Sequence, residues 1–120
     1  MTNSKRTVLV TGASGYLGRS VVRALAESGH HVVATDIQRP QTPHPEGVVV
    51  ATADLRDNSV VALLAKHDIQ TVVHLAAVVT PPRGSGRDLA YAVDVEGTER
   101  LIDGCITHGV QHFVFASSVA

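Results

Sequence analysis

The segment that decides the fold reads Thr11-Gly12-Ala13-Ser14-Gly15-Tyr16-Leu17-Gly18. It follows the strand-forming run TVLVT at residues 7–11 and opens a stretch, residues 14–28, whose apolar side chains recur at helical spacing. Gly29 then stands where the C-terminus of a helix favours glycine. The segment therefore predicts a strand, a tight turn and a helix in direct succession.

Each of the three glycines in this turn has a physical role. Gly12 permits the tight turn off the strand, Gly15 lets the backbone approach a pyrophosphate, and Gly18 allows the helix to pack closely on the sheet. The helix N-terminus favours the phosphate charge, and Ser14 offers a hydroxyl donor. The spacing predicts a dinucleotide-binding turn, although taken alone it also fits an ordinary strand-to-helix connection.

Two acidic positions further along the chain strengthen this interpretation. Asp36 ends a second predicted strand, 18 residues after Gly18, where a carboxylate can accept hydrogen bonds from both hydroxyls of an adenosine ribose. Asp54 and Leu55 follow a third predicted strand, where they could flank the adenine. Asp36 alone would be interpreted as a solvated loop acid, but the combination predicts dinucleotide binding.

Asp36 also bears on which dinucleotide binds. A carboxylate at the ribose repels a 2′-phosphate, so the sequence favours NAD over NADP. Arg39 lies close enough in sequence to weaken this distinction, because an arginine there could accommodate the phosphate. We therefore expect tighter binding of NAD(H) than of NADP(H).

The rest of the chain continues the alternation of short apolar runs and helical patterns. Predicted strands occupy residues 7–11, 31–35, 48–52, 71–75 and 111–116, and predicted helices occupy residues 14–28, 57–67 and 88–108. Strands that alternate with helices pair in parallel through right-handed crossovers. The prediction is an α/β fold, a doubly wound parallel sheet of five strands in the order 3-2-1-4-5.

Composition excludes several other classes of protein. The chain has 120 residues, 44% of them hydrophobic and 18% charged, which is typical of one globular domain. Ten basic and eleven acidic residues give a formal net charge of −1, so no basic excess points to nucleic acid or to an anionic membrane. No apolar run is long enough for a signal peptide or a membrane span, so we expect a cytoplasmic location.

The metal-ligating and nucleophilic side chains suggest no further chemistry. The single cysteine, Cys105, permits no internal disulfide and is expected to be a small buried side chain in a helix. Seven histidines are scattered along the chain, and only His108 and His112 have a helical spacing, which Gly109 interrupts. We therefore expect no metal site.

With these residues in place, the chain resembles the extended short-chain dehydrogenase/reductase family, in particular its NAD-dependent epimerase/dehydratase group. The resemblance begins at the TGxxGxxG spacing of residues 11–18 and extends over essentially the whole chain. Four later segments share it: ADLRD at 53–57, HLAA at 74–77, DVEGT at 94–98 and FVFASS at 113–118. It implies a Rossmann-type fold.

The resemblance also implies functional residues. The cofactor-binding positions are Gly12, Ser14, Gly15, Tyr16, Leu17, Gly18, Asp36, Asp54, Leu55, Leu75, Ala76, Ala77 and Asp94. Ser118 would be the catalytic hydroxyl that hydrogen-bonds the reacting oxygen of the substrate. Position 94 is Asp where the family usually has Asn, and a carboxylate accepts hydrogen bonds without donating them.

The acid/base pair of the family is a Tyr-x-x-x-Lys motif that lies beyond the fifth strand. Neither Tyr16 nor Tyr91 has a lysine four residues later, because those positions are Ser20 and Val95. We therefore expect residues 1–120 to form an incomplete NAD(P)-binding Rossmann domain without the C-terminal substrate-binding region. Whether the chain alone is an enzyme stays open at this point.

The implied function is the NAD(P)-binding portion of an epimerase/dehydratase-like oxidoreductase that acts on a nucleotide sugar or another hydroxyl or carbonyl substrate. The alternative is a non-catalytic NAD(H)-binding or redox-sensing module. A homodimer could form through the helix from Asp88. The fifth strand would expose an apolar edge at residues 113–115, so we expect the chain to be oligomeric or poorly soluble and inactive by itself.

Overall fold

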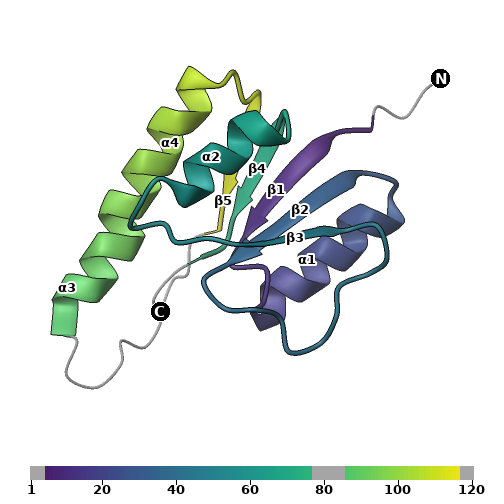
Figure 1. The fold of residues 1–120 in the computed structure, drawn as a ribbon, viewed down its shortest axis with the longest axis horizontal. Coiled ribbons are helices and arrows are strands. Elements are labelled where there is room, and N and C mark those ends of the chain that lie inside the picture. Colours follow the sequence, from purple (N-terminus) through teal and green to yellow (C-terminus); the bar gives the residue numbers. More distant parts are fainter. Residues whose placement is uncertain (1–4, 77–85, 117–120) are drawn as a thin grey trace.

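The computed structural model describes residues 5–76 and 86–116, which form a layered α/β domain (Figure 1). The elements are β1 (Thr7–Thr11), α1 (Tyr16–Glu27), β2 (His31–Asp36), β3 (Val49–Thr52), α2 (Ser59–Lys66), β4 (Thr71–His74), α3 (Gly86–Tyr91), the π-helical segment η1 (Ala92–Gly97), α4 (Thr98–Thr107) and β5 (His112–Phe115).

The five strands form one parallel sheet in the order β3-β2-β1-β4-β5. β1 is central, and its Leu9 pairs with Val33 of β2 and with Val72 of β4. Figure 1 shows α1 against one face of this sheet and α2 and α4 against the other. The predicted fold class and strand order are therefore confirmed.

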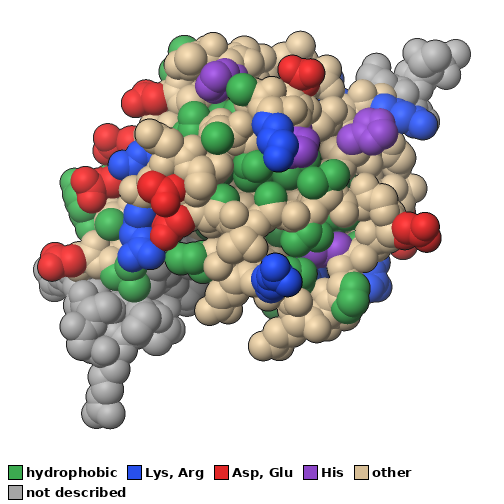
Figure 2. All heavy atoms as spheres, viewed as in Figure 1, with side chains coloured by type: hydrophobic (Ala, Val, Ile, Leu, Met, Phe, Trp, Pro, Cys, Tyr) green, Lys and Arg blue, Asp and Glu red, His purple; other side chains and the backbone are tan. Residues whose placement is uncertain are grey.

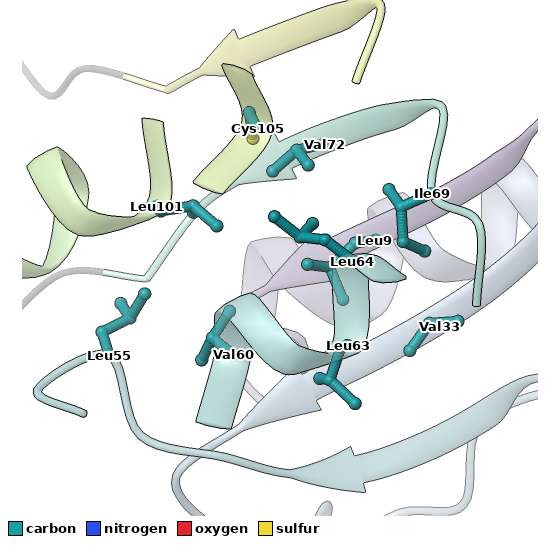
Figure 3. Packing of buried hydrophobic residues seen from close by; sticks show 10 residues of the cluster. All are labelled: Leu9, Val33, Leu55, Val60, Leu63, Leu64, Ile69, Val72, Leu101 and Cys105. Atoms are coloured by element: carbon teal, nitrogen blue, oxygen red, sulfur yellow. The ribbon is translucent and has the colours of Figure 1, made fainter. Parts of the chain in front are cut away.

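Both faces of the sheet are covered, which explains why β1 is apolar at consecutive positions. Leu9 faces α2 and α4, whose buried side chains include Leu64 and Leu101 (Figure 3). Val8 and Val10 point to the opposite face and pack in a second cluster around Val22 of α1. Successive strand residues alternate between faces, so one run of β-branched and aliphatic side chains serves two cores.

The structure is helical over residues 86–107, close to the range predicted, but part of this segment is not an α-helix. Figure 1 shows α3 and α4 as one continuous rod, but residues 92–97 between them have π-helical geometry. The spacing of apolar residues in this stretch indicates which face of the helix is buried. It does not distinguish the hydrogen bonds of a π-helix, which span five residues, from those of an α-helix. The π segment ends at Gly97, where an added Cβ would lie 2.9 Å from the Cβ of Leu55.

The N-terminus of α2 lies within the range predicted for this helix, and a side chain that precedes it supplies a hydrogen-bond acceptor. The helix begins at Ser59, and the Asn58 side chain makes no capping hydrogen bond. Instead, Oδ1 of Asp57 accepts a hydrogen bond of 2.7 Å from the Ser59 amide. The acidic side chain therefore satisfies a first-turn N–H group, as a helix N-terminus requires.

No helix within residues 5–76 and 86–116 is both long enough and apolar enough to cross a membrane. On the face shown in Figure 2, acidic and basic side chains are interspersed over α4 and are not gathered in one basic field. This distribution agrees with the balanced charge of the sequence.

Candidate functional site

A cavity of about 610 Å³ opens beside the carboxyl ends of β1, β2 and β4. This is the edge at which doubly wound sheets bind their ligands, and the volume lies in the usual range for small-molecule pockets. Its walls are formed by Thr11, Gly12, Gly15, Tyr16, Leu17, Gly18, Thr35, Asp36, Ile37, Ala53, Asp54, Leu55, Arg56, Val60, Leu75, Ala76, Leu89 and Val93.

The glycine-rich turn forms one wall of this cavity, and two of its glycines are required by close backbone contacts. Gly12 has a positive φ of 67°, and a Cβ there would lie 2.7 Å from the amide nitrogen of Ala76. A Cβ on Gly18 would lie 2.0 Å from the carbonyl oxygen of Gly12. Gly15 is different, because its nearest contact for a Cβ is 3.5 Å away. Gly15 lines the cavity, so its missing side chain leaves room there.

The N-terminus of α1 faces the same space. Its N-cap residue is Gly15, no side chain caps it, and the first turn contains no acidic residue. The first amides of a helix lack intrahelical acceptors and carry the positive end of the helix dipole. The backbone at Tyr16 and Leu17, both of which line the cavity, is therefore suited to binding an anionic group.

Asp36 lies at the end of β2, and its carboxylate organises the turn. Its Oδ2 accepts a hydrogen bond of 3.0 Å from the Ser14 amide, and its Oδ1 accepts one of 3.3 Å from the Gln38 amide. The Ser14 hydroxyl donates to the carbonyl oxygen of Gln38 at 3.0 Å and does not line the cavity. A carboxylate has about four acceptor positions, so Asp36 retains capacity for ligand hydroxyls.

Asp54 and Leu55 line the far side of the cavity, and Asp54 is engaged by a neighbour that the sequence reasoning missed. The Arg56 guanidinium binds the Asp54 carboxylate through two nitrogens, with Nη2 2.7 Å from Oδ2. The side-chain hydrogen bond from Arg56 holds the pKa of Asp54 below its ordinary value. Leu55 is buried, and its carbonyl oxygen accepts a hydrogen bond of 2.7 Å from Nη1 of Arg100.

Leu75 and Ala76 follow β4, and the backbone at these residues is bound to the end of β1. Oγ1 of Thr11 accepts hydrogen bonds from the amide of Leu75 at 3.0 Å and from that of Ala76 at 3.1 Å. The same oxygen lies 2.6 Å from Nδ1 of His74, a fully buried imidazole. Nε2 of His74 lies 3.0 Å from Oγ1 of Thr98 at the start of α4.

Burial lowers the pKa of His74 to about 4, while the charge of Asp94 acts in the opposite direction. The imidazole is therefore neutral at neutral pH. Asp94 itself is half-buried in η1 and is not one of the cavity-lining residues. Leu89 and Val93, from the same continuous helix, line the cavity instead.

Two predicted site residues, Ala77 and Ser118, lie outside the described residues. The structure does bring together the remaining predicted cofactor residues except Ser14 and Asp94. Sequence reasoning missed the polar contacts of Thr11, His74 and Thr98, although one signal was available. A histidine inside the apolar run TVVHL becomes a buried polar group, and buried polar groups require partners.

Within residues 5–76 and 86–116, no group of three or more His, Cys, Asp or Glu side chains is arranged to hold a metal ion. Cys105 is buried in α4, and burial raises the pKa of its thiol to about 11. A thiol with so high a pKa is a poor nucleophile at neutral pH.

Comparisons with known proteins agree with this geometry. The chain is 35% identical over 117 residues to a 3-beta-hydroxysteroid dehydrogenase from Mycolicibacterium neoaurum, a match that covers 92% of this chain. A short-chain dehydrogenase/reductase superfamily protein from Agrobacterium tumefaciens, solved with bound NAD, is 37% identical with a TM-score of 0.79 over 93% of the chain. The UDP-glucose 4-epimerase of Thermotoga maritima, solved with UDP-glucose, is 26% identical with a TM-score of 0.81, again over 93%.

The chain spans about a third of the length of these proteins: 31% of the dehydrogenase, 32% of the Agrobacterium protein and 38% of the epimerase. The family model described as NAD dependent epimerase/dehydratase matches residues 8–120, which is nearly the whole chain. The match begins in β1 and includes the glycine-rich turn, Asp36 and the Asp54–Leu55 pair. This chain therefore belongs to the NAD dependent epimerase/dehydratase family.

Proposed function

We propose that this chain binds NAD(H) in the cavity and is the cofactor-binding portion of an epimerase/dehydratase-like oxidoreductase. The observation that carries this proposal is the convergence of three features on one cavity of about 610 Å³. They are the uncapped N-terminus of α1, the carboxylate of Asp36 and the Asp54–Leu55 segment. Each has a chemistry that suits one part of a dinucleotide.

In the proposed complex, the amides at Tyr16 and Leu17 receive the pyrophosphate, and Gly15 leaves space for it. Asp36 accepts hydrogen bonds from the adenosine ribose, while Asp54 and Leu55 flank the adenine. The path toward the nicotinamide is lined by Leu75, Ala76 and, by resemblance, Ala77. Ser14 and Asp94 lie outside the cavity wall and would support the site from behind it.

The preference for NAD over NADP is part of the proposal. Both oxygens of Asp36 are oriented by backbone amides, so a 2′-phosphate at the ribose would meet a fixed negative charge. Isothermal titration of the chain with NAD⁺ and with NADP⁺ tests this directly. We expect binding of NAD⁺ to be tighter by about tenfold or more. Equal affinities would contradict the cofactor preference, and binding of neither would contradict the function.

A matched pair of variants separates the effect of Asp36 from that of nearby basic residues. Asp36→Asn removes the charge at the ribose, so we expect the affinity for NAD⁺ to fall and the discrimination against NADP⁺ to weaken. Arg39→Gln changes an exposed side chain of the following loop and is the control. If Arg39→Gln changes the NADP⁺ affinity more than Asp36→Asn does, Arg39 sets the preference.

The activity that we propose belongs to the longer protein, with a nucleotide sugar or another hydroxyl or carbonyl compound as substrate. The nicotinamide cofactor supplies the hydride acceptor or donor when it is bound. Ser118 would donate a hydrogen bond to the reacting oxygen of the substrate. Turnover of a 3β-hydroxysteroid is followed by NADH absorbance, and turnover of UDP-glucose by detection of an epimerised product, because epimerisation returns the cofactor to NAD⁺; both compounds are associated with relatives of the chain.

The alternative is a non-catalytic NAD(H)-binding or redox-sensing module, which would need the same cavity but no acid/base pair. Tight NAD(H) binding without turnover of either compound is the outcome expected of such a module, and equally of a cofactor-binding portion tested by itself. Turnover by the chain itself would exclude it. In either case we propose a cytoplasmic location.

We also propose that the helix from Asp88 contributes to a homodimer. Four apolar side chains on α3, η1 and α4 are exposed, at 58%, 38%, 40% and 77% of their surface: Tyr91, Val95, Ile102 and Ile106. Their spacing places them along one side of the rod, away from the face that carries Leu101 and Cys105 into the core. Analytical ultracentrifugation tests for the dimer, and a monomer at all concentrations would contradict it.

A further inference from the structure

The hydrogen bonds around Thr11 indicate a role for His74, which does not itself line the cavity. A hydroxyl oxygen has two lone pairs and one proton. Both lone pairs of the Thr11 oxygen are directed to amides, those of Leu75 and Ala76, at 3.0 and 3.1 Å. The remaining contact of this oxygen, at 2.6 Å to Nδ1 of His74, must therefore use the hydroxyl proton.

This assignment determines the tautomer of the imidazole. Because Nδ1 of His74 accepts the Thr11 proton, the ring proton of the neutral imidazole is on Nε2. Nε2 then donates to Oγ1 of Thr98 at 3.0 Å. An imidazolium would place a second N–H against an oxygen whose lone pairs are already occupied, so both burial and hydrogen bonding favour the neutral ring.

The backbone that this arrangement holds is the wall of the cavity. Leu75 and Ala76 line the cavity, and Ala76 lies so close to Gly12 that a Cβ on Gly12 would be 2.7 Å from its nitrogen. The amide of Leu75 also donates to the Thr11 carbonyl at 3.3 Å, whereas the Ala76 amide has the Thr11 hydroxyl oxygen as its acceptor. A rotation of this hydroxyl would therefore release Ala76 first.

We propose that His74 is a positioning residue of the cofactor site: it orients the Thr11 hydroxyl, which holds the Leu75–Ala76 backbone against the glycine-rich turn, and it ties this backbone to α4 through Thr98. The ring also packs on β5, with its centroid 5.6 Å from that of Phe115 in a stacked arrangement. His74 thus joins β1, β4, β5 and the long helix at the carboxyl edge of the sheet. The predicted effect of His74 on cofactor affinity rests on the proposed function, whereas its tautomer and its hydrogen bonds do not.

The tautomer is tested in the unaltered chain by nitrogen NMR of labelled histidine. We expect His74 to carry its proton on Nε2 and to remain neutral from pH 8 to about pH 5.5. A proton on Nδ1, or titration of His74 near the ordinary histidine value, would overturn the proposal whatever the cofactor does.

Three variants test the positioning role. His74→Asn keeps an acceptor near the place of Nδ1, His74→Leu keeps the bulk without an acceptor, and Thr98→Val removes only the Nε2 contact. We expect His74→Leu to weaken NAD⁺ binding about tenfold and to speed hydrogen exchange at the Ala76 amide. His74→Asn should recover most of both effects, and Thr98→Val should change them least.

Equal losses in His74→Asn and His74→Leu would show that an acceptor at the place of Nδ1 makes no difference and would overturn the proposal. If His74→Leu does not fold, Thr11→Ser and Thr11→Val make the same comparison, because only serine keeps the hydroxyl. If the unaltered chain binds no NAD⁺, the proposed function fails, while the tautomer and the Ala76 exchange rates still decide the role of His74.

Discussion

Gly18 lies so close to Gly12 that a Cβ at position 18 would be 2.0 Å from the Gly12 carbonyl oxygen. The obstructing atom belongs to the backbone of the turn and cannot rotate away. We expect Gly18→Ala to destabilise the chain by about 2 kcal/mol or more, because the turn and α1 must separate. Urea denaturation measures this, and an unchanged free energy of unfolding would show that the turn is more adaptable than its contacts imply.

Gly15→Ala is the matched test, because the new Cβ meets its nearest atom at an ordinary 3.5 Å. Gly15 has a φ of −78° and a ψ of 175°, which alanine adopts without strain, so we expect the weaker N-cap preference of alanine to lower stability by less than about 1 kcal/mol. Cofactor affinity should nevertheless fall, since the methyl group projects toward the proposed pyrophosphate position. A variant with lost stability and intact NAD⁺ binding would reverse our assignment of the two glycines.

The neutral state of His74 predicts a loss of stability in acid. Its pKa is about 4 in the folded chain and 6.5 ordinarily, so the unfolded chain binds the proton first as the pH falls. The contribution of neutral His74 to the free energy of unfolding is complete above pH 6.5 and is lost progressively down to about pH 4. The difference between the two pKa values corresponds to a loss of roughly 3 kcal/mol.

Denaturation curves of the unaltered chain and of His74→Asn, recorded between pH 7.5 and 4, isolate this contribution. Titrations common to both chains cancel in the difference between them. We expect the two curves to converge as the pH falls. Parallel curves would mean that His74 takes up its proton as easily in the folded chain as in the unfolded one.

Arg56 controls the titration of Asp54, whose pKa it lowers through hydrogen bonds to both carboxylate oxygens. Because the pKa of Asp54 is lower in the folded chain, its contact with Arg56 stabilises the fold fully at pH values above the ordinary aspartate pKa. This stabilisation is lost as the pH falls through the lowered pKa of the folded chain. In Arg56→Gln, we expect the pKa of Asp54 to return toward its ordinary value of 3.8. Carbon NMR of the carboxyl group reports it, and high salt should produce part of the same change.

Two apolar surfaces could cause self-association, and single lysine substitutions distinguish them. Ile106 on α4 is 77% exposed, and Val114 on β5, the edge strand of the described sheet, is 51% exposed. If the proposed dimer uses the helix, Ile106→Lys should raise the dissociation constant about tenfold or more, while Val114→Lys leaves it nearly unchanged. The opposite ranking would assign the association to the exposed strand edge.

Much of this molecule could be predicted from local patterns. The strand order followed from the alternation of β-branched runs with helical spacing, and part of the cavity wall followed from Gly12, Gly15, Gly18 and Asp36. These features are encoded within short stretches, because glycine requirements and hydrophobic periodicity are local. The π-helical turn at residues 92–97 escaped prediction because apolar spacing does not report hydrogen-bond partners.

By itself, the sequence determined the doubly wound sheet and the place of a phosphate-binding turn, since steric rules and burial of apolar side chains act along the chain. Only the tertiary structure decided what each polar group does. Thr11, His74 and Thr98 are far apart in sequence, and they meet because parallel pairing brings the ends of β1 and β4 under the start of α4. A hydrogen bond depends on distance and direction in space, and these exist only after the layers have packed.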